Sequence, residues 1–186
     1  MKAIEILMEE HRLIERVLAA LERATTRLSR GEEVYLRFFT GAAYFNKAYT
    51  DGCHNRKEEN ILFPALVEAG SDGEAGPVAA MIADHAEGRH LAQTMRQMTE
   101  RFQGGDARAR GQVVQSASRY IELLQGHIYK EDNILFPLAD KLIPTDQLQH
   151  MGEAFSQVEY DESGEELHEK YRGLVERLEK ECLRSA

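Results

Sequence analysis

The chain has 186 residues, of which 42% are hydrophobic and 30% charged, and its formal net charge is −9. This composition is ordinary for a soluble globular protein, and the acidic balance argues against nucleic-acid binding, which requires clustered Lys and Arg. No apolar run approaches the roughly 20 residues that span a bilayer, so we expect no membrane partner. The only cysteines, Cys53 and Cys182, lack the spacing of a disulfide framework or a thiolate site, which favours a reducing, cytoplasmic location.

The first two predicted helices form one hairpin. Strong helix formers dominate the chain and β-branched runs are absent, and apolar residues recur at spacings of three and four. The first helix is predicted over about residues 3–29 and the second over about residues 33–67. Pro64 lies inside the second pattern, which predicts a bend or a local break near Phe63.

The next two predicted helices form a second hairpin. One begins around Pro77, a residue suited to a first helical turn, and the other covers about residues 107–142. Four helices with short connections predict an all-α fold, an antiparallel up-down-up-down four-helix bundle over residues 1–143. Residues 144–186 are predicted to form two additional C-terminal helices that pack on the bundle or on a partner subunit.

Two segments that lie 73 residues apart have nearly the same sequence. One reads His54-Asn-Arg-Lys-Glu-Glu-Asn-Ile-Leu-Phe-Pro and the other reads His127-Ile-Tyr-Lys-Glu-Asp-Asn-Ile-Leu-Phe-Pro. Each places a glutamate, Glu58 or Glu131, four residues after the histidine. Because residues four apart share one face of a helix, each pair projects side by side. The chain is therefore interpreted as two copies of one helical hairpin.

Two further histidines, His11 and His85, lie 74 residues apart on the predicted apolar faces. Imidazole nitrogen and carboxylate oxygen together suit iron, manganese or zinc. A lone His-x-x-x-Glu motif is usually a solvated pair on a helix surface. Here, however, four imidazoles and two carboxylates would be buried at a heavy cost without metal, and the two carboxylates would repel each other. The sequence therefore predicts a two-metal site whose ligands are His11, His54, Glu58, His85, His127 and Glu131.

This pattern, with both Leu-Phe-Pro continuations, resembles the hemerythrin-like (HHE cation-binding) family over about residues 1–160. The resemblance implies a carboxylate-bridged, non-haem centre of two iron ions in a four-helix bundle, with the four histidines as terminal ligands and Glu58 and Glu131 as bridges. The spacing in the oxygen carriers of that family would instead select Asp132 as the second bridge. The symmetry of the repeat favours Glu131 and leaves Asp132 beside the site or at the surface.

The sequence departs from the oxygen carriers four residues after His85, where they have a further histidine and this chain has Arg89. Glu15, four residues after His11, makes a third His-x-x-x-Glu. Two roles for Glu15 are open at this point: it ligates one iron in place of the missing histidine, or it pairs with Arg89. Ligation is slightly favoured.

The resemblance implies a protein that binds oxygen or related small molecules, such as peroxide or nitric oxide, for oxygen or redox handling. One alternative is a di-iron enzyme that consumes peroxide or nitric oxide, and whether the centre turns over stays open. Another alternative is an iron-responsive or structural module whose C-terminal helices report metal occupancy to a partner. A homo-oligomer is compatible with each of these functions.

Overall fold

The computed structural model describes residues 3–163 and 167–185, and within them every regular element is a helix and no strand occurs. None of these helices is both long and apolar enough to cross a lipid bilayer. In chain order, with η marking π-helices, the helices are α1 (Ala3–Ser29), α2 (Arg37–Phe45), η1 (Asn46–Asn55), η2 (Glu58–Leu62), α3 (Phe63–Glu68), α4 (Pro77–Gln103), α5 (Ala109–Lys130), η3 (Glu131–Leu135), α6 (Phe136–Leu142), α7 (Thr145–Ser163) and α8 (Leu167–Glu181).

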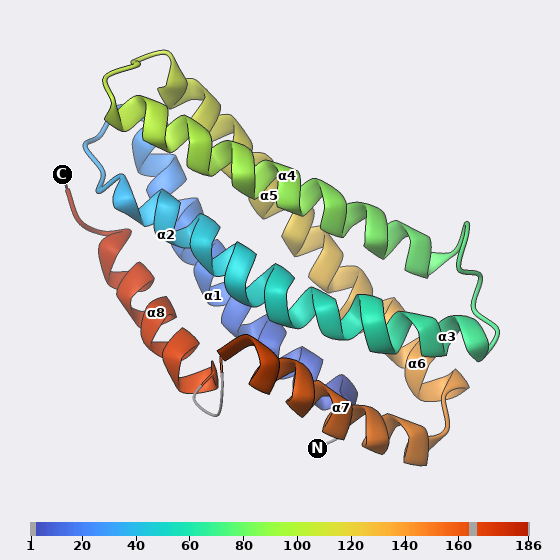
Figure 1. Cartoon of the computed structure of the whole chain (residues 1–186). Helices are drawn as coiled ribbons and strands as arrows, with labels where there is room; N and C mark the ends of the chain where they lie inside the picture. Colours follow the sequence, from blue (N-terminus) through green and yellow to red (C-terminus); the bar gives the residue numbers. More distant parts are fainter. Residues whose placement is uncertain (1–2, 164–166, 186) are drawn as a thin grey trace.

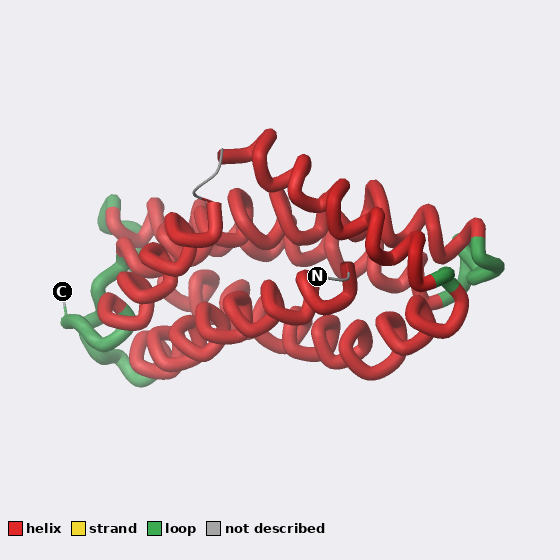
Figure 2. The backbone as a smooth tube through the Cα atoms, turned by 90° about the horizontal axis from the view of Figure 1, so that it is seen from below, coloured by secondary structure: helices red, strands yellow, loops and turns green. Residues whose placement is uncertain are grey.

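Four helical segments lie side by side along the molecule: α1, the run from α2 to α3, α4, and the run from α5 to α6 (Figure 1). Helix α5 packs against both α1 and α4, and α2 packs against α4. The connecting loops gather at the two ends of the molecule (Figure 2). Gly31 and Gly105 take φ values of 88° and 96° in two of these loops, a conformation that glycine adopts without steric cost. The arrangement is consistent with a helical bundle.

The helix does not break at the internal prolines. In an α-helix a proline ring clashes with the carbonyl four residues earlier and removes one hydrogen bond. Here the turns before Pro64 and Pro137 widen into the π-helices η2 and η3, where the N–H of the following phenylalanine bonds to Glu58 O or Glu131 O, five residues back. Near Phe63, where the sequence predicts a bend or a local break, the helix does not break but continues through a widened turn that begins at a candidate ligand.

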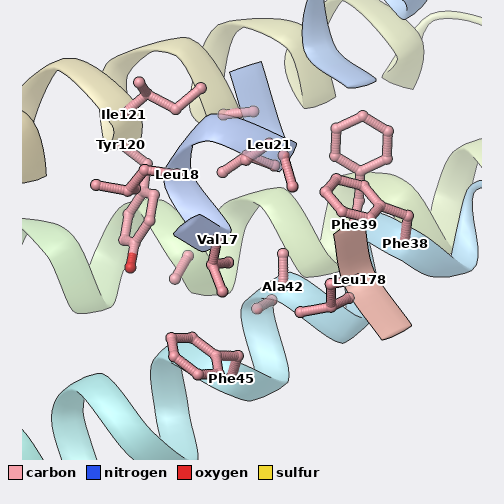
Figure 3. Close-up of a cluster of buried hydrophobic side chains, with 14 of the residues drawn as sticks. Val17, Leu18, Leu21, Phe38, Phe39, Ala42, Phe45, Tyr120, Ile121 and Leu178 are labelled. Atoms are coloured by element: carbon pink, nitrogen blue, oxygen red, sulfur yellow. The ribbon is translucent and has the colours of Figure 1, made fainter. Parts of the chain in front are cut away.

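Buried apolar side chains form two separate clusters. The larger cluster joins α1, α2, α4, α5 and α8, and Figure 3 shows Leu21, Phe38, Phe39 and Leu178 converging in it. The smaller cluster lies toward the other end and includes Leu7 of α1 together with residues of α3, α4, α6 and α7. Each fully buried side chain of this size contributes about 1.5–3 kcal/mol. Along each of the four segments, the stretch between the two clusters carries buried histidine or glutamate residues.

The two C-terminal helices pack mainly against two of these segments, α1 and the run from α2 to α3. Helix α8 contacts α1 and α2, and α7 contacts α1, η1 and η2 (Figure 1). Tyr171, Leu174 and Leu178 of α8 are buried and belong to the larger cluster, whereas Phe155 of α7 is buried in the smaller one. These two helices therefore cover the side of the molecule that α1 and α2 present.

Candidate metal centre

Six polar side chains are enclosed between the two apolar clusters, and none of them is more than 3% exposed. They are the six residues that the repeat singled out: His11 of α1, His54 of η1, Glu58 of η2, His85 of α4, His127 of α5 and Glu131 of η3. They form two groups of four, within each of which one potential ligand atom per residue lies within 4.8 Å of the others. The structure thus brings together residues that are up to 120 positions apart in the chain.

The first group consists of His11, His54, Glu58 and Glu131. The Nε2 atoms of His11 and His54 are 3.1 Å apart. His11 Nε2 lies 3.2 Å from Glu131 Oε2, and His54 Nε2 lies 3.5 Å from Glu58 Oε1. Two nitrogen ligands of one ion are about this far apart when each metal–nitrogen bond is about 2.1 Å long. The four side chains therefore fit around a single cation.

The second group repeats the first with His85 and His127, whose Nε2 atoms are also 3.1 Å apart. His85 Nε2 lies 3.3 Å from Glu58 Oε2, and His127 Nε2 lies 3.2 Å from Glu131 Oε2. Glu58 turns one oxygen to each group, whereas Glu131 presents the same oxygen to both. Both glutamates therefore stand where a carboxylate can bridge two ions.

All four carboxylate oxygens of Glu58 and Glu131 are buried without a hydrogen-bond partner among the described residues. A buried carboxylate without a partner costs several kcal/mol, and proteins compensate such a charge by pairing it or by coordinating a metal. Two such carboxylates among four imidazoles form a nitrogen and oxygen donor set that suits a transition metal such as iron, manganese or zinc. The residues present therefore fit a pair of metal ions.

The electrostatics of the site favour positive charge. Burial alone would lower the pKa of His11, but its hydrogen bond to Asp132 and the nearby negative charges of Glu131 and Glu58 overcome this effect and raise the pKa to about 9. Burial likewise opposes the shift at His127, where Glu131 and Asp84 raise the pKa to about 10. Burial would raise the pKa of Glu131, but the nearby histidines lower it strongly. A bound cation would supply the positive charge that this field favours.

Each imidazole also faces a second carboxylate through Nδ1, the ring nitrogen on the far side from the centre. Four residues, which we call the outer carboxylates, do this: Asp132 is 2.7 Å from His11, Glu10 is 2.9 Å from His54, Glu59 is 2.7 Å from His85, and Asp84 is 3.4 Å from His127. Such partners fix the orientation and tautomer of metal-binding histidines, because a donating Nδ1–H leaves Nε2 free to bind. The imidazoles of His11, His54 and His85 are thereby oriented toward the centre, whereas Nδ1 of His127 makes no hydrogen bond of good geometry with any described residue.

Each outer carboxylate is paired in turn with a basic side chain. The pairs are Glu10 with Lys57, Glu59 with Arg89, Asp84 with Lys130, and Asp132 with Arg12. The sequence singled out neither Glu10 nor Asp84 nor the two lysines. A signal was nevertheless present, since Glu10 and Asp84 immediately precede the repeated histidines and the two lysines follow the other two histidines at the same offset.

The two Leu-Phe-Pro continuations have a structural role. The Phe136 ring stacks on His11, with centroids 5.4 Å apart and an interplanar angle of 13°. Phe63 stacks on His85 in the same way, at 5.8 Å and 19°. Each phenylalanine thus covers an imidazole of the other hairpin, which shields the centre from water and ties the two repeats together.

Glu15 is the one candidate ligand that the structure does not bring into the centre. Its side chain is 42% exposed and its carboxylate lies 2.9 Å from the guanidinium of Arg12. Glu15 has the same spacing from its histidine as Glu58 and Glu131, but its side chain turns toward Arg12 at the surface. The alternative pairing with Arg89 is not present either, because Arg89 donates to Asp51 and Glu59. Both sequence-based roles for Glu15 are corrected accordingly.

Comparison with known proteins gives one family. The model of the hemerythrin HHE cation-binding domain matches residues 2–139, which include all six residues of the centre. Among curated proteins, the chain is 26% identical over 163 residues to the uncharacterized proteins Rv1995 of Mycobacterium tuberculosis (strain H37Rv) and Mb2018 of Mycobacterium bovis. The match covers 88% of this chain but only 63% of each relative. No solved structure matches the chain significantly.

Proposed function

The chain belongs to the hemerythrin HHE cation-binding family, and on that basis we propose that it is a non-haem di-iron protein that binds oxygen or related small molecules, such as peroxide or nitric oxide. The observation that carries the proposal is the set of four partnerless, buried carboxylate oxygens on Glu58 and Glu131, enclosed by four imidazoles. Oxidisable iron at this donor set would supply the binding of oxygen and its relatives. Iron is chosen over zinc or manganese by family, since affinity order alone does not select it.

In this proposal each histidine is a terminal ligand and each of the two glutamates bridges both ions. His11 and His54 serve one ion, and His85 and His127 serve the other. At His11, His54 and His85 the outer carboxylates would keep Nδ1 protonated and Nε2 available, and Phe63 and Phe136 would restrict access of water. The four segments would follow the antiparallel up-down-up-down order, with residues 144–186 as an appended unit. Two buried free cysteines support a reducing, cytoplasmic setting.

The proposal is tested by reconstituting the metal-free protein with ferrous iron under anaerobic conditions and measuring the iron retained after desalting. We expect two irons per chain, and a visible absorption band when the oxidised protein is mixed with azide. Stoichiometric zinc in the protein as purified, with no retained iron and no visible band, would contradict the proposal.

A second candidate function, a metal-responsive module, is favoured by one contact between α7 and the centre. The ammonium of Lys57 lies 5.7 Å from the ring centroid of Phe155 in α7, and it pairs with Glu10, which accepts a hydrogen bond from His54. Metal at His54 is therefore connected to the C-terminal helices by three successive contacts. This candidate predicts that iron binding changes the protease sensitivity of α7 and α8 while no small molecule binds the iron.

A further inference from the structure

A small cavity lies beside the imidazoles of His85 and His127, and neither Glu58 nor Glu131 lines it. It therefore lies outside the carboxylate bridge, on one side of the second group. The space open to the centre of a water-sized molecule is ≈ 10 Å³, about what a single water requires. A molecule of two or three non-hydrogen atoms could thus enter it only with one end, while its other end would lie beside the imidazoles of His85 and His127.

Thr50 supplies a buried hydroxyl to this cavity. It lines the cavity and is 1% exposed, and its hydroxyl neighbours that of Tyr120 but makes no hydrogen bond of good geometry with any described residue. The side-chain oxygen of the neighbouring Asn46 is already engaged, since it accepts a hydrogen bond of 2.6 Å from Tyr120. Leaving a buried hydroxyl without a partner costs about 1–3 kcal/mol, so the Thr50 hydroxyl is poised to bind a guest in the cavity.

Gly88 leaves this side of the centre open. The 74-residue offset that relates His85 to His11 relates Gly88 to Ile14, which is 2% exposed and packed in the larger cluster. The first repeat thus has a branched side chain where the second has only hydrogen. A methyl group on Gly88 would lie 3.4 Å from Leu124 Cδ2, which is a close but tolerable contact. The two halves of the centre therefore differ in the room they offer.

We infer that the exogenous ligand binds at the His85–His127 half of the centre, where its outer atom accepts a hydrogen bond from the Thr50 hydroxyl and occupies the space left by Gly88. The ligand class is a small molecule of two or three non-hydrogen atoms with a terminal hydrogen-bond acceptor, such as peroxide or azide. Thr50 is a positioning residue in this account. The inference rests on the proposed di-iron function and adds which half is open and which side chain selects the ligand.

The test measures the affinity of the iron-loaded protein for azide by titration of the visible band, together with iron content. Thr50→Val keeps the shape and removes the donor, so azide binding weakens about three- to tenfold. Thr50→Ser, which keeps a hydroxyl, restores most of the affinity. The matched control is Thr25→Val, because Thr25 is also a buried, partnerless hydroxyl but lies about 21 Å along α1 from His11. This control leaves azide affinity unchanged.

A second variant tests the space itself. Gly88→Ala places a methyl group in the cavity, so azide affinity falls about tenfold while two irons remain bound. In the metal-free protein the same variant raises Tm by a few degrees, about as much as Gly173→Ala, which adds a methyl to an open position of α8. Comparing the Tm values of Gly88→Ala and Gly173→Ala thus shows whether a fall in azide affinity comes from lost space in the cavity or from lost stability of the fold.

The outcomes separate this inference from the function beneath it. The di-iron function stands if the native protein binds two irons and azide. In that case, native azide affinity in Thr50→Val, as in Thr25→Val, or in Gly88→Ala overturns the assignment of the ligand to the His85–His127 half. If the native protein retains no iron, the function and the inference both fail. Loss of azide affinity in Thr50→Val with rescue in Thr50→Ser supports the inference.

Discussion

Lys57 and Lys130 occupy equivalent places in the two repeats, each three residues after a histidine of the centre, yet their surroundings differ. Lys57 and its partner Glu10 have side chains that are 0% and 1% exposed. Lys130 is 41% exposed and its partner Asp84 is 19% exposed. The same substitution at both positions therefore compares a buried ion pair with a hydrated one in a single protein.

Lys57→Met should destabilise the protein by about 3–5 kcal/mol, because it leaves the Glu10 carboxylate buried without its cation. Lys130→Met should cost about 0–1 kcal/mol, because water screens that pair and replaces the lost contact. For a chain of this size, 1 kcal/mol of stability corresponds to about 2–4 °C in Tm. The expected fall in Tm is therefore about 6–20 °C for Lys57→Met and less than about 4 °C for Lys130→Met. Both are measured on metal-free protein by circular dichroism during thermal and denaturant unfolding.

A double variant checks the cause. Adding Glu10→Gln to Lys57→Met removes the orphaned charge, so part of the lost stability should return. Equal losses at the two lysines, or a double variant that is less stable than Lys57→Met alone, would refute the reasoning that burial of Glu10 without its ammonium partner governs the effect.

Removing iron with a chelator should lower Tm, because an ion at a free concentration of 100 times its Kd stabilises the folded state by about 2.7 kcal/mol per site. Calorimetry with and without iron checks this, and an unchanged Tm would count against a buried metal centre. Glu131→Gln should reduce bound iron from two per chain to at most one, because a neutral amide replaces a bridging anion; metal analysis after desalting decides it, and retention of two irons would remove Glu131 from the bridge. Glu15→Gln should retain both irons and change the free energy of unfolding by less than about 0.5 kcal/mol, whereas loss of one iron would reinstate Glu15 as a ligand.

The six residues of the centre could be singled out from sequence because repetition adds information that one motif lacks. His54 and Glu58 alone would be interpreted as an ordinary pair on a helix surface. The copy of this pair at His127 and the matching offset between His11 and His85 favour a metal site instead. Helical periodicity likewise predicted α1 at the bounds that the structure has. Patterns that depend only on spacing along a helix were therefore predictable.

Features that depend on the exact direction of a side chain were not predictable. Glu15 satisfies the same four-residue spacing as Glu58, but in α1 it rotates toward Arg12 and water. The turn at Glu58 widens to accommodate Pro64. A proline in a helical sequence pattern does not show whether the helix will widen or break. The burial of Lys57 could not be predicted from the sequence. Lysine is almost never fully buried unless it is paired, and the partner of Lys57, Glu10, lies 47 residues away in the chain.

The way the ligands are shared has a consequence during protein synthesis. Three of the four residues in the first group, His11, His54 and Glu58, lie within the first 58 residues, and only Glu131 comes from the second repeat. If the first hairpin folds as it leaves the ribosome, it would offer three donors to an ion before Glu131 has been synthesised. A metal ion bound at that stage would lack its fourth protein ligand. Binding of Glu131 to that ion would then help to position the second hairpin against the first.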